Sequence, residues 1–187
     1  MPISTSGRAA QRRLELTLAT APEVAERLLA AFVEAGGNLV DTAAAYGGGE
    51  AERMIGRLIR TDLARDDLVI ATKTGIVTSR FFGLPTGLDA RPERIGPALD
   101  ASLQRLGVDH VDLYYLHRVD PRVPIEESIG AMAELVDAGK VRALGVSEVT
   151  ADELRRAHAE HPLAAVRLPR HGVKDKLLFA LSVFTAH

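Results

Sequence analysis

The sequence predicts an α/β protein with a parallel sheet of the (β/α)8 TIM-barrel type, incomplete, with about five or six of the eight βα units present. Short apolar runs alternate with segments of helical length, which implies right-handed βα crossovers. The runs are apolar on both faces, as strands of a helix-covered sheet are. An open doubly wound sheet usually shows G-x-G-x-x-G after its first strand, and the sequence contains none. Barrel enzymes instead carry polar residues at the C-terminal ends of several strands, and the apolar runs here lead to Asp41, Lys73, His117 and Ser147.

The first elements precede the glycine pair at 36–37. Residues 14–18 alternate apolar and polar side chains, which predicts a short strand. Thr20 and Glu23 have the spacing of a capping box, with proline in the first turn, and apolar residues from Val24 to Val33 follow at helical spacing. The glycine pair ends this helix, and the strand that leads to Asp41 comes next.

Helices and strands then alternate along the rest of the chain. We expect helices at 50–60, 92–106, 124–138 and about 150–160, and strands at 67–73, 110–117, 141–146 and 163–166. No linker divides the chain, so residues 1–187 are interpreted as a single domain. The segment 75–91 is glycine-rich and long for a βα connection, which makes it a candidate active-site loop.

Composition narrows the class of protein. The chain is 47% hydrophobic and 26% charged, as soluble globular domains are, and its net charge of −2 gives no reason to expect a nucleic-acid partner. The absence of cysteine excludes disulfides and thiolate metal sites, and we predict no metal site. The start lacks an apolar signal core, and the apolar patch at 177–184 is too short to cross a bilayer. We therefore expect a soluble, cytoplasmic protein without a membrane partner.

The stretch 38–47 is the centre of the predicted site. Its short apolar run ends at Asp41, and Tyr46 follows five residues later, at the start of the glycine run 47–49. This pattern is typical of a buried strand that delivers its last side chain to a site, followed by a loop that carries a phenol to the same place. Asp-Thr-Ala-x-x-Tyr-Gly resembles the signature of the aldo-keto reductases.

Three later stretches strengthen that resemblance. Lys73 follows the apolar run 68–72, His117 ends the run 111–117, and the segment 140–147 matches another family segment. The resemblance covers about 20–166 of this chain. It implies the barrel fold and the reduction of a small-molecule aldehyde or ketone by hydride transfer from NADPH or, less often, NADH.

The resemblance also implies roles for the site residues. Tyr46 is the general acid, Lys73 makes its phenol more acidic, Asp41 is the counter-charge of Lys73, and His117 orients the carbonyl. The chemistry is consistent, since a free phenol with a pKa of about 10 is a poor acid near neutrality and a neighbouring ammonium strengthens it. Asp41 and Ser147 are expected at the cofactor. Many family members have Ser-Asn where this chain has Ser147 and Glu148.

Taken singly, each of these residues has a plain structural interpretation. Asp41 could cap the next element, Tyr46 could anchor a loop, Lys73 could be a solvated strand end, and His117 could be a satisfied polar residue at a sheet rim. Two further interpretations of the whole chain stay open. One is a non-catalytic cofactor-binding or regulatory module on the same fold, and the other is an inactive truncated fragment.

The two ends of the chain depart from the family. The glycine-rich first strand normal to the family is absent from 1–19, and 167–187 form a divergent tail without a family motif, as a frame change or a truncated gene would produce. Arg167 places a charge where the barrel lumen would be, and Pro169 removes a hydrogen-bond donor, so we do not expect the tail to continue the sixth strand as usual. An unclosed sheet has two open edges, from which we expect self-association. The resemblance also implies that the segments which hold the adenine end of the cofactor are missing, so we expect weak or no binding of NADPH.

Overall fold

The computed structural model describes residues 13–15, 22–79 and 83–167. They form a six-stranded parallel sheet in the order β1-β2-β3-β6-β7-β8 and a separate two-stranded sheet, β4-β5. The strands of the large sheet are β1 (Arg13–Glu15), β2 (Leu39–Asp41), β3 (Val69–Thr74), β6 (Val111–Leu116), β7 (Val141–Ser147) and β8 (Leu163–Arg167). The helices are α1 (Pro22–Glu34), α2 (Glu50–Thr61), α3 (Pro92–Leu106), α4 (Ile125–Asp137) and α5 (Ala151–Glu160).

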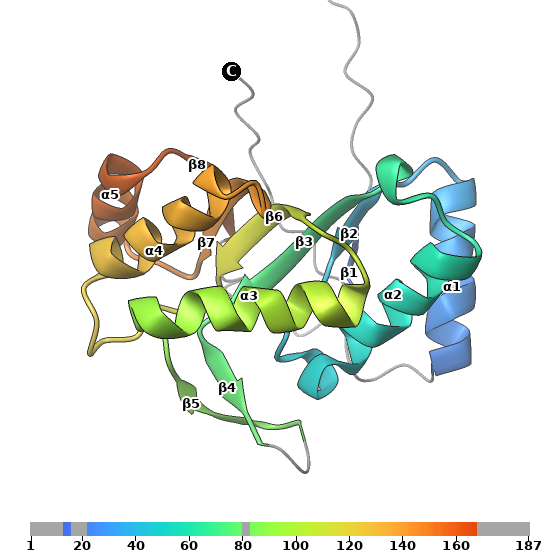
Figure 1. Cartoon of the computed structure of the whole chain (residues 1–187), viewed down its shortest axis with the longest axis horizontal. Helices are drawn as coiled ribbons and strands as arrows, with labels where there is room; N and C mark the ends of the chain where they lie inside the picture. The colour runs from blue at the N-terminus through green and yellow to red at the C-terminus, as the bar shows by residue number, and fades with distance from the viewer. Residues whose placement is uncertain (1–12, 16–21, 80–82, 168–187) are drawn as a thin grey trace, which may run out of the picture.

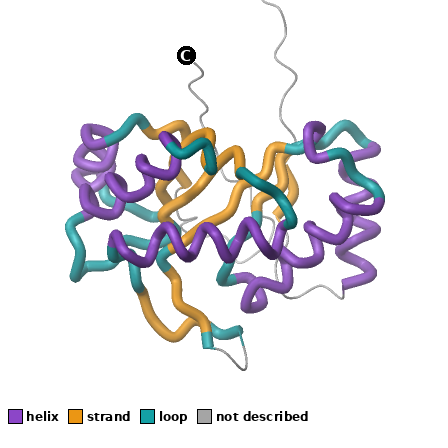
Figure 2. The backbone as a smooth tube through the Cα atoms, viewed as in Figure 1, coloured by secondary structure: helices purple, strands orange, loops and turns teal. Residues whose placement is uncertain are grey.

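The helices surround one face of the curled sheet (Figures 1 and 2). The larger core lies between the sheet and its helices, where side chains such as Leu29, Ile55, Leu99, Ile129 and Met132 are fully buried. Burying each such side chain contributes about 1.5–3 kcal/mol. Strand residues that alternate with those of the larger core point to the other face of the sheet. There they form a smaller cluster, made up of Leu39, Ala71, Leu113, Tyr115 and Ala165. The predicted α/β class and the parallel barrel-type sheet are therefore confirmed.

Local sequence explains where the helices begin and end. Helix α3 has proline in its first turn and ends at Gly107 in the left-handed conformation. Helix α5 begins with a capping box, in which the Thr150 hydroxyl accepts from the Glu153 amide and the Glu153 carboxylate accepts from the Thr150 amide. The helix bounds expected from the sequence are correct to within about two residues, which is the usual uncertainty at helix ends. Thr20 and residues 16–18 lie outside the described residues.

The segment 75–91 differs from the expected glycine-rich loop. It contains the antiparallel pair β4 (Ile76–Thr78) and β5 (Pro85–Leu88), in which Ile76 faces Leu88 and Val77 faces Gly87. Three consecutive β-branched residues favour the extended backbone and explain the first of these strands. The hairpin projects from the rest of the fold (Figure 1).

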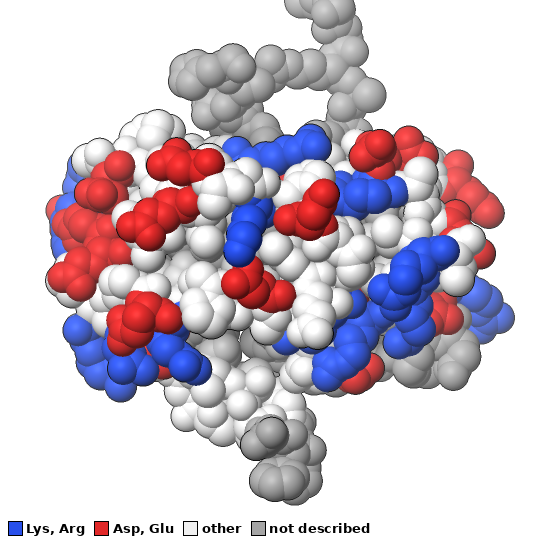
Figure 3. All heavy atoms as spheres, in the orientation of Figure 1, with Lys and Arg blue, Asp and Glu red and all other residues white. Residues whose placement is uncertain are grey.

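The face of the molecule seen in Figure 3 carries charges of both signs. Several ion pairs join neighbouring elements, including Arg57–Glu26 at 3.1 Å and Arg156–Glu126 at 2.6 Å. Exposed pairs of this kind contribute about 0–1 kcal/mol each. None of the described helices is long and apolar enough to span a membrane.

Candidate active site

Asp41 and Lys73 form a buried ion pair at the C-terminal edge of the sheet. Asp41 is the last residue of β2, Lys73 lies on the neighbouring strand β3, and each is 1% exposed. The Lys73 ammonium donates to Asp41 Oδ1, to the Thr42 carbonyl at 2.7 Å and to the Tyr46 hydroxyl at 3.1 Å. A buried ammonium is tolerated when acceptors satisfy its N–H groups in this way. Lys73 is therefore held by the strand end and by the turn that follows it.

Tyr46 is brought back to this pair by a glycine turn. It begins the 3-10 turn η1 (Tyr46–Gly49), in which Gly47, Gly48 and Gly49 have φ of 67, 60 and 91°. Residues other than glycine rarely adopt such φ values. The three glycines therefore allow the chain to turn sharply between β2 and α2. The Lys73 nitrogen also lies 4.6 Å from the centroid of the Tyr46 ring. The ammonium consequently contacts both the face and the hydroxyl of the phenol.

His117 completes the predicted group. It directly follows β6, and its amide donates to the Thr74 carbonyl at 2.9 Å, which extends the pairing of β3 with β6. Its ring meets the Tyr46 ring edge to face, with centroids 5.9 Å apart and planes at 82°. Four side chains singled out from the sequence thus gather at one edge of the sheet, around the phenol of Tyr46.

Ser147 lies at the same edge, at the end of β7. It is 2% exposed, and its register partner on β8 is Arg167. Glu148 follows with φ 53°, and its carboxylate pairs with the Arg118 guanidinium. The position after Ser147 is therefore occupied by a carboxylate that already has a cationic neighbour.

Arg167 is a member of the site that the sequence did not identify as one. Its Nη1 lies 3.3 Å from the Tyr46 hydroxyl and 3.9 Å from Asp41 Oδ2. A charge in the barrel lumen was expected at this position from the sequence. Its contacts with Tyr46 and Asp41 were not. Strand β8 also includes Arg167, one residue more than expected, because the Glu148 amide donates to its carbonyl at 2.8 Å. The rest of the tail lies outside the described residues.

The contact of Arg167 with Asp41 depends on the curl of the sheet. Three strands, β3, β6 and β7, separate β8 from β2. In a flat sheet their backbones would stand about 19 Å apart, given a spacing of about 4.8 Å between neighbouring strands. Opposing side chains meet at 3.9 Å because the sheet curves around them. The site is therefore on the concave face.

A buried carboxylate on α2 connects the elements that surround the site. Glu52, on α2, is fully buried and accepts from the Thr72 hydroxyl at 2.6 Å and from Arg105 Nε at 2.6 Å. Thr72 adjoins Lys73, so this network joins α2, β3 and α3 around the turn that carries Tyr46.

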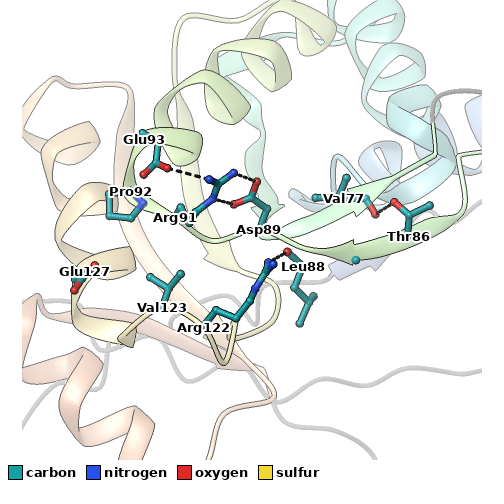
Figure 4. A pocket seen from close by; sticks show the side chains of 11 residues that line it. Val77, Thr86, Leu88, Asp89, Arg91, Pro92, Glu93, Arg122, Val123 and Glu127 are labelled. Carbon is teal, nitrogen blue, oxygen red and sulfur yellow. Dashed lines mark hydrogen bonds and ion pairs between the residues drawn. The ribbon is translucent and has the colours of Figure 1, made fainter.

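A cavity of about 650 Å³ lies beside the β4-β5 hairpin and the start of α3, and none of the site residues lines it (Figure 4). The Arg91 guanidinium pairs with Asp89 at 2.8 Å and lowers the pKa of that carboxyl. Arg122 similarly lowers the pKa of Asp120, which lies in the loop before α4. The two arginines that line this cavity, Arg91 and Arg122, are thus both paired with carboxylates. Among the described residues, no cluster of His, Asp and Glu is placed to hold a metal ion.

Comparison with known proteins shows the family to which this chain is similar. The Aldo/keto reductase family model matches residues 12–175. Aldo-keto reductase str7 of Strobilurus tenacellus is 45% identical over 142 residues, covering 76% of this chain and 40% of that protein. Aldo-keto reductase yakc [NADP(+)] of Schizosaccharomyces pombe is 38% identical over 146 residues, covering 78% of this chain and 43% of that protein.

Solved structures share the fold. The glycerol dehydrogenase AKR11B4 of Gluconobacter oxydans superimposes with a TM-score of 0.77 at 30% identity, covering 84% of this chain and 50% of that one. The chain thus spans about two fifths of the length of these curated relatives and half of this structure.

Proposed function

The chain belongs to the aldo/keto reductase family, and from that premise we propose that it reduces an aldehyde or ketone to an alcohol with NADPH as the hydride donor. The observation that carries the proposal is the position of the Lys73 ammonium, which bridges the Asp41 carboxylate and the Tyr46 hydroxyl. The preference for NADPH over NADH follows the name of the Schizosaccharomyces pombe relative. The substrate is a small carbonyl compound.

Tyr46 is the proton donor in this proposal. Its hydroxyl proton passes to the carbonyl oxygen as that oxygen gains negative charge, and the phenolate that remains is stabilised by the ammonium 3.1 Å away. Asp41 keeps Lys73 charged in its buried position. His117, beside the Tyr46 ring, is placed to orient the carbonyl. Solvent returns a proton to Tyr46 after the alcohol leaves.

The residues at the C-terminal edge fit the nicotinamide end of the cofactor. Ser147 offers a hydroxyl and Asp41 a carboxylate, which match the amide and hydroxyl groups of a nicotinamide nucleoside. We propose that these two residues hold that end. The chemistry that a reduced nicotinamide would supply there is a hydride for the carbonyl carbon.

Two measurements on the purified chain test this function. The first follows the loss of NADPH absorbance with a small reactive aldehyde, and the second titrates NADPH fluorescence without substrate. Turnover that Tyr46→Phe abolishes is the expected result. Binding without turnover would instead identify a non-catalytic module, and neither binding nor turnover would identify an inactive fragment.

A further inference from the structure

Arg167 brings a second cation to the phenol of Tyr46. Its Nη1 is 3.3 Å from the Tyr46 oxygen, and that oxygen is also 3.1 Å from the Lys73 nitrogen. The position is well defined, because Arg167 pairs in register with Ser147 and its carbonyl accepts from the Glu148 amide. The side chain is 10% exposed. Water therefore screens this cation only weakly.

Both cations approach the phenol at its oxygen. The Lys73 ammonium and the Arg167 guanidinium each lie within hydrogen-bond distance of that atom. Both side chains also face the Asp41 carboxylate. Arginine stays charged throughout the range in which a phenol ionises. A charged donor at the oxygen favours the ionised phenol, because it interacts more strongly with the phenolate than with the neutral hydroxyl.

Other charged residues stand at the adjoining strand ends. Glu148, after β7, and Arg118, after β6, pair with each other. Glu15, the last residue of β1, is the register partner of Asp41. Ser147, at the end of β7 itself, is uncharged.

We propose that Arg167 is a positioning residue that acts through Tyr46, stabilising the ionised phenol together with Lys73 and so making Tyr46 a stronger acid. This inference deepens the proposed function, on which its meaning for catalysis rests. Within that function, Tyr46 must be protonated to reduce a carbonyl. A stronger acid therefore moves the alkaline limit of the reduction to lower pH.

The tyrosine content of the chain gives a direct way to observe this ionisation. There are three tyrosines and no tryptophan, so phenolate absorbance is simple to assign. Tyr114 is fully buried, its hydroxyl donates to the Ile95 carbonyl at 3.4 Å, and burial raises its pKa. Tyr115 is 2% exposed in the apolar cluster of the concave face. Tyr46 is half-buried and is the tyrosine that we expect to ionise first.

The test is an alkaline titration of the full chain, followed by phenolate absorbance with circular dichroism recorded at each pH. We expect the first step in the parent to lie below the ordinary phenol value of about 10 and to disappear in Tyr46→Phe. In Arg167→Gln the step should rise by about one unit or more, and in Arg167→Lys by less, because the charge is kept. Arg142→Gln is the control. Arg142 is exposed at the opposite end of β7 and should leave the step unchanged.

Two results would overturn the inference. One is a Tyr46 step at the same pH in Arg167→Gln as in the parent. The other is a parent step at or above about 10, which decides the matter even if the glutamine variant fails to fold. The titration needs neither cofactor nor substrate. A shifted step in a chain without turnover would keep the inference about Arg167 and refute the proposed function.

Discussion

The Lys73 nitrogen lies 3.1 Å from the Tyr46 hydroxyl oxygen, and the same ammonium also donates to the Asp41 carboxylate. A phenol in water receives no such help, and its pKa of about 10 makes it a weak acid near neutrality. The contact gives Tyr46 a charged neighbour that is itself only 1% exposed. Each side chain should therefore contribute to the chemistry in a distinct, measurable way.

Tyr46→Phe should remove turnover and leave any NADPH binding nearly unchanged. The phenol gives up its proton in the transition state but is not needed to hold the dinucleotide, so kcat should fall by about 10²- to 10⁴-fold. Steady-state rates with a reactive aldehyde, beside a fluorescence titration, measure the two effects. Equal rates for variant and parent would remove Tyr46 from the mechanism.

Lys73→Met should cost stability as well as rate. It leaves the Asp41 carboxylate buried without its ammonium partner, and breaking a buried pair typically costs about 3–5 kcal/mol. Adding Asp41→Asn to Lys73→Met should recover part of this loss. Urea denaturation of the two single variants and the double variant measures the coupling. Strictly additive losses would contradict a direct Asp41–Lys73 interaction.

Gly56→Ala should destabilise the fold although alanine favours helices. A Cβ at Gly56, on α2, would lie 2.5 Å from the Arg105 carbonyl oxygen and 2.7 Å from that of Leu106, so α2 and α3 would have to separate. We expect a loss of about 1–3 kcal/mol in the free energy of unfolding, as overpacking usually causes.

Gly130→Ala is the matched control for that prediction. Gly130 lies inside α4, and the nearest atom to the added methyl group would be the flexible Glu160 Oε1 at 3.4 Å. Alanine should therefore be neutral or stabilise the chain by about 0.5–1 kcal/mol. Thermal melts compare the two variants. A Gly56→Ala chain as stable as Gly130→Ala would show that α2 and α3 are not in close contact.

Asp120 should make stability depend on acid pH. Hydrogen bonds from the Arg122 guanidinium and amide lower its pKa below the ordinary 3.8. Because the folded-state pKa is the lower one, the stabilisation is complete above the unfolded value and is lost as pH falls below 3.8 towards the lowered value. Asp120→Asn should flatten this part of a plot of Tm against pH. An unchanged slope would exclude Asp120 as its source.

Much of the fold follows from local pattern. The alternation of apolar runs with helical segments determined the class, because strands with two buried faces are apolar throughout. Residues at strand ends were predictable as site residues for a related reason. The C-terminal ends of parallel strands meet at one edge, which is where Asp41, Lys73 and His117 lie.

Features that depend on distant pairing were not predictable. The β4-β5 hairpin needs Ile76 to meet Leu88, and neither segment shows this partner in its own pattern. The contact between Arg167 and Tyr46 depends on the curvature of the intervening strands, which no single strand specifies. Glu52 was missed because its partners, Thr72 and Arg105, come from two other elements.

The bond between Arg167 and Tyr46 joins residues 121 positions apart in the chain. Contacts of such long sequence separation form slowly, because the entropy of closing the loop must be overcome before they stabilise anything. Here β3, β6 and β7 lie between the strand that precedes Tyr46 and the strand that carries Arg167, so we expect the two residues to meet after these strands have paired. During refolding, the environment of the Tyr46 phenol should therefore mature last and mark the moment at which the sheet is complete.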